Sequence, residues 1–240
     1  MNHEYLDYRD GDLVCEGYVV CDETKRAQRP CVLVSHTWGG QSENERQIAR
    51  DIAQLGYVAM ALDVYGKGIR GGTQEENEKL MQPFIADRAL LRRRLIAAVD
   101  AAKAHPLVDP DSIGIVGYCF GGLCALDLAR SGTQGVRAAV SVHGIFYPPG
   151  LGEQERIIAK ILVLHGYADP LAPPEHVLGL AKELTDAQAD WQLHAYGHTM
   201  HAFTNPAANL PAAGMMYSPA AARRSWIAMK NFLEEVLGSR

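Results

Sequence analysis

No stretch of the sequence is apolar over a length that could cross a bilayer. The first residues lack the basic segment followed by an apolar one that marks a secretory signal, so we expect a cytoplasmic protein with no membrane partner. The 240 residues also lack an excess of basic charge. The net charge is −5 with both signs interspersed, which argues against a nucleic-acid partner. The longest basic run, Arg92 to Arg94, falls in a helical pattern and predicts a solvated helix face.

The sequence has few cysteines, and their spacing matches no paired cysteine motif. The five cysteines form no Cys-x-x-Cys pair, and their odd number argues against both a disulfide framework and a zinc site. Cys31 and Cys124 lie within apolar runs, which is typical of packing residues. Cys119 alone has the glycine-rich surroundings that a reactive thiol needs.

The segment from Ile113 to Gly122 organises the rest of the chain. An apolar run of strand length ends at Gly117, and Gly-Tyr-Cys-Phe-Gly-Gly then leads into a helical pattern. This is the strand–turn–helix of a nucleophile elbow, with Cys119 where the common pattern Gly-x-Ser-x-Gly has serine. Side chains two residues away on either side would collide with the neighbouring strand and helix, so glycine is needed there. The helix N-terminus would favour a thiolate. The alternative is a tight turn that merely contains a buried cysteine.

Strand-like and helical patterns alternate along most of the chain. This alternation predicts an α/β fold, with a mainly parallel β-sheet and helices on both faces. No repeat or linker divides residues 1–240, so we expect a single domain. The expected strands are 30–35, 57–62, 113–117, 136–142, 160–164 and 191–196. A peripheral hairpin begins with 13–20 and the polar turn 22–29. The expected helices are 43–55, 75–104 (one or two, interrupted near Pro83), 123–130, 174–187 and 221–237.

A thiol nucleophile needs a base in hydrogen-bond reach, and that base needs an orienting group. In α/β-hydrolases the order along the chain is nucleophile, acid, histidine. Asp169 directly follows a predicted strand, which places it at the carboxyl edge of the sheet; its alternative role is that of a turn residue before proline. The loop after the next predicted strand contains His198 and His201, and the order of residues leaves both open as the base.

Three motifs in this order resemble the dienelactone hydrolase family of α/β-hydrolases. They are Gly-Tyr-Cys-Phe-Gly-Gly at 117–122, His-Gly-x-x-Asp-Pro at 165–170 and His-Ala-Phe at 201–203, and the resemblance runs from about residue 32 to the C-terminal helix. It implies an α/β-hydrolase fold, a triad of Cys119, Asp169 and His201, and no metal or organic cofactor. It also implies an oxyanion hole formed by the backbone N–H groups of Trp38 and Phe120.

Two positions depart from the pattern of the family. Thr37 stands where the name-giving enzymes carry a glutamate that helps to activate the thiol. Asn205 stands where they carry an arginine that binds the substrate carboxylate, and an uncharged amide cannot replace that charge-assisted contact. We therefore expect a neutral or bulkier ester rather than dienelactone. Thr37, Asn205, Tyr65 and Phe84 are the candidates for the substrate pocket, and the segment from 66 to 83 could be a lid or simple surface.

The leading hypothesis is an ester-bond hydrolase that acts on carboxylic esters or lactones through a covalent acyl-enzyme at Cys119. One alternative is hydrolysis of phosphotriesters by the same three residues. A second alternative is a non-catalytic protein on the same fold that binds ligands or senses oxidants through the thiol. The partner is then a small molecule, and both a monomer and a homodimer are open.

Overall fold

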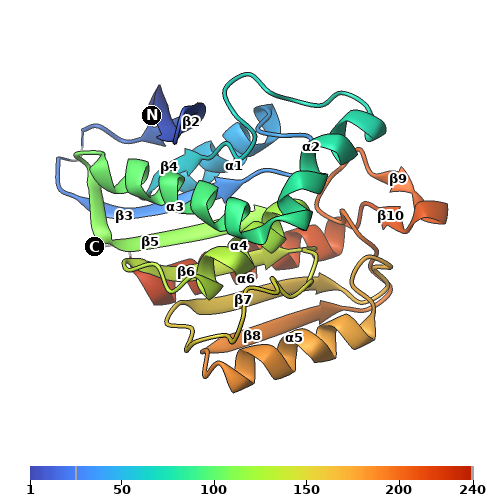
Figure 1. Cartoon of the computed structure of the whole chain (residues 1–240). Coiled ribbons are helices and arrows are strands. Elements are labelled where there is room, and N and C mark those ends of the chain that lie inside the picture. Colours follow the sequence, from blue (N-terminus) through green and yellow to red (C-terminus); the bar gives the residue numbers. More distant parts are fainter. Residues whose placement is uncertain (25, 239–240) are drawn as a thin grey trace.

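The computed structural model describes residues 1–24 and 26–238. Eight strands form one sheet in the order β1-β2-β4-β3-β5-β6-β7-β8 (Figure 1). The six strands from β3 to β8 are parallel to one another, whereas β1 and β2 join the sheet antiparallel. Their bounds are β1 (Asn2–Asp10), β2 (Leu13–Cys21), β3 (Arg29–Ser35), β4 (Val58–Ala61), β5 (Val108–Tyr118), β6 (Val136–Val142), β7 (Lys160–Gly166) and β8 (Trp191–Tyr196).

Helices cover both faces of the sheet, which confirms the predicted architecture. α1 (Glu43–Gln54) and α6 (Pro219–Leu237) contribute to the apolar core on one face. α3 (Arg88–Ala104), α4 (Phe120–Arg130) and α5 (Pro174–Asp186) contribute to the core on the other, together with part of α2 (Gln74–Ala86). Neighbouring residues of β3 alternate between the two cores, so every position of this strand is buried. This double burial explains the continuous apolar runs of the central strands.

The N-terminal hairpin differs from the prediction. β2 pairs with β1 across the turn at Gly11 and then with β4, so its hairpin partner precedes it in the chain and the predicted turn at 22–29 is not a hairpin turn. β1 escaped prediction because most of its side chains are exposed and polar, which leaves no apolar alternation. The basic run differs in part: Arg93 is exposed as predicted, whereas Arg94 is only 6% exposed and pairs with Asp10 at 2.8 Å. It ties the hairpin to α3 instead of facing solvent.

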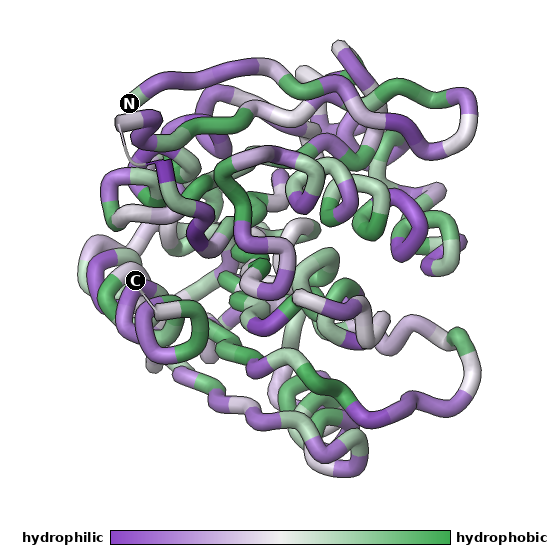
Figure 2. Tube along the Cα trace, turned by 90° about the vertical axis from the view of Figure 1, so that its left-hand side faces the viewer, coloured by the Kyte–Doolittle hydropathy of each residue, from purple (hydrophilic) through white to green (hydrophobic). Residues whose placement is uncertain are grey.

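The segment 75–104 forms two helices. They are separated at Asp87, whose side chain accepts a hydrogen bond from the Leu90 N–H and so begins α3, whereas Pro83 lies inside α2. Hydrophobic and hydrophilic residues alternate around the helical turns (Figure 2). No described helix is long and apolar enough to pass through a membrane.

The carboxyl ends of the parallel strands meet at one edge of the sheet. Ser35 at the end of β3 pairs with Gly117 of β5, and Tyr118 at the end of β5 pairs with Val142 of β6. The loops that follow these strands therefore meet above the sheet, where α/β folds place their ligand sites. Beside them lies a short segment made of β9 (Asn209–Leu210), the 3₁₀-helix η1 (Pro211–Ala213) and β10 (Met215–Met216).

Candidate active site

Cys119 occupies the turn between β5 and α4 in a backbone conformation that is rare for a residue with a side chain. Its φ is 57° and its ψ is −118°. A Cβ atom on Gly117 would lie 1.8 Å from the Gly121 carbonyl oxygen, and one on Gly121 would lie 2.4 Å from the Ser35 carbonyl oxygen. The glycine requirement predicted for the elbow is therefore confirmed. Such strain persists only where surrounding structure enforces it, and it is common at functional sites.

Cys119 is also the one cysteine whose surroundings suit a reactive thiol. The other four are buried, whereas Cys119 is partly exposed and lines a cavity of about 1010 Å³. Burial raises the pKa of the Cys15 thiol to about 11 and that of Cys31 to about 12, which keeps both protonated at neutral pH. Cys31 and Cys124 are completely buried, as predicted for packing residues. Only Cys119 combines access to a cavity with a helix N-terminus.

Asp169 and His201 meet beside this thiol. Oδ2 of Asp169 accepts a hydrogen bond from Nδ1 of His201 at 2.7 Å, and both residues are buried. Oδ1 of Asp169 accepts a second hydrogen bond, at 2.8 Å, from the backbone N–H of Leu171. His198, the other candidate, is exposed and does not line the cavity. The structure thus brings Asp169 to His201 and leaves His198 on the surface.

The imidazole of His201 keeps its proton far above the usual range. Burial by itself would lower the pKa of His201. The negative charge of Cys119 and hydrogen bonds with Asp169 and Cys119 outweigh burial and raise this pKa to about 10. The ring of His201 therefore lies between the thiol of Cys119 and the carboxylate of Asp169. His201 is thus within hydrogen-bond reach of both other predicted residues.

The backbone around His201 is held in place by short contacts between loops. A Cβ atom on Gly166 would lie 2.6 Å from the Thr199 carbonyl oxygen, so the loop before His201 can approach β7 only because this residue is glycine. The Ala168 N–H donates to the same Thr199 oxygen at 2.9 Å. On the other side, the His201 N–H donates to the carbonyl of Gly214 at 2.9 Å. The His-Gly-x-x-Asp-Pro motif thus has a packing role beyond supplying the acid.

The loop after β3 is fixed from below by a buried histidine. Nδ1 of His36 donates to the Thr37 carbonyl at 2.6 Å, and its Nε2 accepts from the Val64 N–H at 3.1 Å. Burial lowers the pKa of His36, so the ring is neutral and can make both bonds. The Tyr65 hydroxyl donates to the Trp38 carbonyl at 2.8 Å. Sequence reasoning missed this role of His36, whose only signal was its place directly after a buried strand.

Two backbone N–H groups near the thiol are free to act as donors. Among the described residues, neither the Trp38 N–H nor the Phe120 N–H makes a backbone hydrogen bond. Phe120 is the first residue of α4, where an N–H has no acceptor within the helix. These are the two groups that the sequence proposed for the oxyanion hole.

The four pocket candidates divide into two pairs. Thr37 and Asn205 line the cavity. Tyr65 and Phe84 do not: they are 5% and 7% exposed, and their rings pack 5.5 Å apart in the core below the site. Their prediction as pocket residues is wrong, because an aromatic residue near the sheet edge fills the core as readily as it meets a ligand. Tyr65 acts instead as the support of Trp38.

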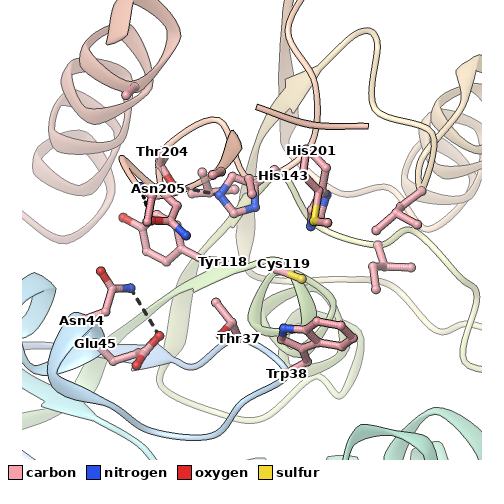
Figure 3. A pocket seen from close by; sticks show the side chains of 18 of the residues that line it. Thr37, Trp38, Asn44, Glu45, Tyr118, Cys119, His143, His201, Thr204 and Asn205 are labelled. Carbon is pink, nitrogen blue, oxygen red and sulfur yellow. Dashed lines mark hydrogen bonds between the residues drawn. The ribbon is translucent and has the colours of Figure 1, made fainter. Parts of the chain in front are cut away.

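His143 is the cavity residue that the sequence did not reveal. It follows β6 directly, with a φ of 37°, and its Nε2 forms a hydrogen bond of 2.8 Å with the Thr204 hydroxyl. Its ring lies edge-on to that of His201, with centroids 5.1 Å apart (Figure 3). Burial and the positive charge of His201 hold the pKa of His143 well below its usual range, so this imidazole is neutral. No motif surrounds it, and only its position after a parallel strand could have indicated it.

The cavity is walled by helices and by the β9–η1–β10 segment. α1, α2 and α6 each turn one row of side chains towards it. Part of the segment 66–83, the beginning of α2, is therefore cavity wall. Within residues 1–24 and 26–238, no three His, Cys, Asp or Glu side chains are grouped so that they could hold a metal ion.

Comparisons with known proteins identify the family of this chain. Residues 15–237 match the family model described as the dienelactone hydrolase family. A Caenorhabditis elegans protein is 37% identical over 60% of this chain and 93% of its own. An Aquifex aeolicus protein, provisionally named a carboxymethylenebutenolidase, is 26% identical over 98% of this chain and 99% of its own.

Solved structures extend the likeness to the fold. A dienelactone hydrolase-like promiscuous phosphotriesterase from metagenomic libraries is 36% identical, and the match covers 99% of both chains with a TM-score of 0.93. A dienelactone hydrolase from Anabaena variabilis is 21% identical over 98% of both chains, with a TM-score of 0.67, and shares the fold. With its α/β-hydrolase fold and a family match along nearly its whole length, the chain belongs to the dienelactone hydrolase family.

Proposed function

We propose that this protein hydrolyses carboxylic esters or lactones through a covalent acyl-enzyme formed on Cys119. Its family makes it a hydrolase of ester bonds. The observation that carries the finer proposal is the placement of His201, whose Nδ1 donates to Oδ2 of Asp169 at 2.7 Å while the same ring is in hydrogen-bond contact with Cys119. A sensor thiol needs neither partner, so the intact pair of acid and base argues against the redox-sensing alternative.

Acylation begins when His201 takes the proton of the Cys119 thiol. The Cys119 thiolate attacks the carbonyl carbon, a C–S bond forms, and the carbonyl oxygen takes up the negative charge. The N–H groups of Trp38 and Phe120 receive this oxyanion, and donors of this kind contribute about 3–4 kcal/mol of transition-state stabilisation. The imidazolium of His201 then gives its proton to the departing alkoxide, which leaves as the alcohol and creates a thioester.

Deacylation reverses these roles. Neutral His201 takes a proton from water, whose oxygen attacks the thioester carbon. The collapse of this second oxyanion breaks the C–S bond and releases the carboxylic acid, so the thiolate and the imidazolium are restored. Asp169 holds the ring in one tautomer throughout, as the acid of such a triad does.

Trapping the intermediate tests this mechanism. We expect para-nitrophenyl acetate to give a burst of nitrophenolate and an acetyl adduct on the peptide containing Cys119, detected by mass spectrometry after acid quenching. Cys119→Ala should lose both, whereas Cys21→Ala, which changes a buried cysteine outside the cavity, should keep both. Should Cys119→Ala keep ester turnover while peroxide still modifies the wild-type thiol, the redox-sensing alternative is correct.

A second candidate activity is the hydrolysis of phosphotriesters. It is favoured by the likeness to the promiscuous phosphotriesterase, 36% identical over 99% of both chains. The same thiolate and the same N–H groups suit a phosphoryl centre, whose transition state also gathers charge on one oxygen. Comparing turnover of para-nitrophenyl acetate and diethyl para-nitrophenyl phosphate would decide between the two, and we expect the carboxylic ester to be preferred.

A further inference from the structure

The charged side chains that line the cavity are nearly all of one sign. Apart from the two histidines, they are the carboxylates of Glu45, Asp51 and Glu78, and no lysine or arginine of the described chain belongs to the lining. None of the three carboxylates forms an ion pair within residues 1–24 and 26–238. The cavity therefore holds three carboxylates that no lysine or arginine of the described residues contacts.

Glu45 is the most deeply placed of the three. It is only 1% exposed, and its Oε2 accepts hydrogen bonds from the Ser42 N–H at 2.8 Å and the Ser42 hydroxyl at 2.6 Å. This capping box at the N-terminus of α1 supplies hydrogen-bond donors but no cation. These donors and the N-terminus of α1 stabilise the Glu45 carboxylate, so its negative charge can persist beside the cavity without a cationic partner. Figure 3 shows Glu45 and Asn44 on the same side of the cavity as Tyr118.

The negative charges of Glu45 and Asp51 act on Tyr118, the residue before Cys119. Asp51 lies on α1 as Glu45 does, and both line the cavity. Burial is the main cause that raises the pKa of the Tyr118 hydroxyl, and the charges of Asp51 and Glu45 raise it further. Tyr118 directly precedes Cys119 in the chain. A substrate group held near Tyr118 would thus feel both carboxylates.

The rest of the lining suits a weakly hydrated cation. Glu78 adds a carboxylate from α2, on another wall of the cavity. Trp38, Trp226 and Tyr147 add aromatic rings. Aromatic faces and carboxylates together are what bind quaternary ammonium groups in proteins. A carboxylate on the substrate would meet only repulsion in this part of the cavity.

We propose that the cavity selects esters that carry a cationic group, such as a quaternary ammonium, and discriminates against esters that carry a carboxylate. This inference rests on the proposed ester hydrolysis at Cys119 and adds a substrate class to it. Over the distances within such a cavity, a single carboxylate at intermediate dielectric should change the relative rate for a cationic ester by about threefold to tenfold.

Three aryl esters of the same length test the proposal. Their acyl chains end in trimethylammonium, in tert-butyl or in carboxylate, so that the first two share a shape and differ in charge. Each kcat/KM is divided by the hydroxide-catalysed rate of the same ester, which removes differences in intrinsic reactivity. We expect the normalised order cationic, neutral, anionic, with a spread that shrinks as salt rises, because salt screens the attraction.

Variants locate the effect. Asp51→Asn and Glu78→Gln should each lower the ratio of cationic to neutral kcat/KM by about threefold or more. Taking the ratio cancels any general loss of catalysis. Glu75→Gln is the matched control. The substitution removes the same charge from α2, but Glu75 pairs with Lys79 and does not line the cavity, so the ratio should not change. If a variant fails to fold, the salt dependence of the wild type still decides.

Failure of this inference can be told apart from failure of the proposed function. A protein that hydrolyses the neutral ester but shows a ratio of one or less, or prefers the anionic ester, overturns the charge selection alone. So does a ratio that neither salt nor the two cavity variants change. A protein that hydrolyses none of the three esters overturns the proposed function and this inference with it.

Discussion

Nδ1 of His201 lies 2.7 Å from Oδ2 of Asp169, although 32 positions separate the two residues in the sequence. This bond places the proton of the neutral ring on Nδ1, so the other ring nitrogen is the one that exchanges a proton with substrate groups. It also stabilises the charged form of the ring. The first prediction concerns this second effect.

Asp169→Asn should lower activity and move its alkaline limit. The neutral amide no longer stabilises the imidazolium, so the pKa of His201 should fall from about 10, and the decline of kcat/KM at high pH should begin at a lower pH. We also expect kcat to fall by about 10³–10⁴-fold, as when the acid of such a triad is replaced. Profiles of kcat/KM against pH measure both effects. Asp190→Asn, on the surface beside Lys160, is the control, and an unmoved alkaline limit in Asp169→Asn would contradict the prediction.

Removing the thiol should make His201 easier to deprotonate. The charge of Cys119 is the largest of the influences that raise the pKa of His201, so this pKa should fall clearly below about 10 in Cys119→Ala. Titration of the histidine ring signals by NMR measures the shift. Cys21→Ala, whose thiol is buried outside the cavity, should leave the His201 titration unchanged. An identical titration in Cys119→Ala and wild type would show that the two groups do not share a proton.

Two glycine substitutions should have opposite effects on stability. In Gly121→Ala the new Cβ would lie 2.4 Å from the Ser35 carbonyl oxygen, so we expect a loss of about 3 kcal/mol or more in the free energy of unfolding. Gly179 lies in α5 with no neighbouring atom within 4 Å of such a Cβ, and Gly179→Ala should gain about 0.5–1 kcal/mol. Urea denaturation of both variants provides the comparison. Equal effects would contradict the tight fit at the elbow.

The helix that follows Cys119 should depend on a buried ion network. Asp127 of α4 contacts Arg88 of α3 at 2.6 Å and Arg130 at 3.1 Å, and all three side chains are buried. Asp127→Asn leaves two arginines without their full counter-charge, so we expect a loss of about 3–5 kcal/mol in stability. The exposed pair of Glu75 and Lys79 is the comparison, and Glu75→Gln should cost less than about 1 kcal/mol. Thermal and urea denaturation measure both losses.

Much of the fold could be predicted because buried parallel strands leave a strong local signal. The continuous apolar run in β3 and the helical spacing of α1 each report on one element and its immediate surroundings. β1 left no such signal, since its stability comes from pairing with β2 and its side chains stay polar. Arg94 was misjudged for a related reason: its partner Asp10 is 84 positions away.

The site residues could be predicted because they lie in short motifs whose residue types indicate a particular backbone conformation. Gly117 is required by its close contact with Gly121 inside the elbow, and Gly121 by its close approach to the Ser35 carbonyl at the end of β3. The glycines of the motif therefore indicate a strained turn in the sequence itself. His36 and His143 carry no such mark. Their roles arise from Val64 and Thr204, which are distant in the chain, and no local pattern records those pairings.

The sequence by itself determined that strands and helices alternate and that Cys119 stands in an elbow. It did so because backbone constraints and apolar periodicity act over a few neighbouring residues. The His-Ala-Phe motif also favoured His201 over His198. Only the tertiary structure decided that Nδ1 of His201 meets Oδ2 of Asp169, that Tyr65 supports the loop of Trp38 from the core, and that carboxylates from α1 and α2 line one cavity. These outcomes depend on which distant segments the packed sheet brings together. The burial of a side chain and the charges around it are set only by that packing.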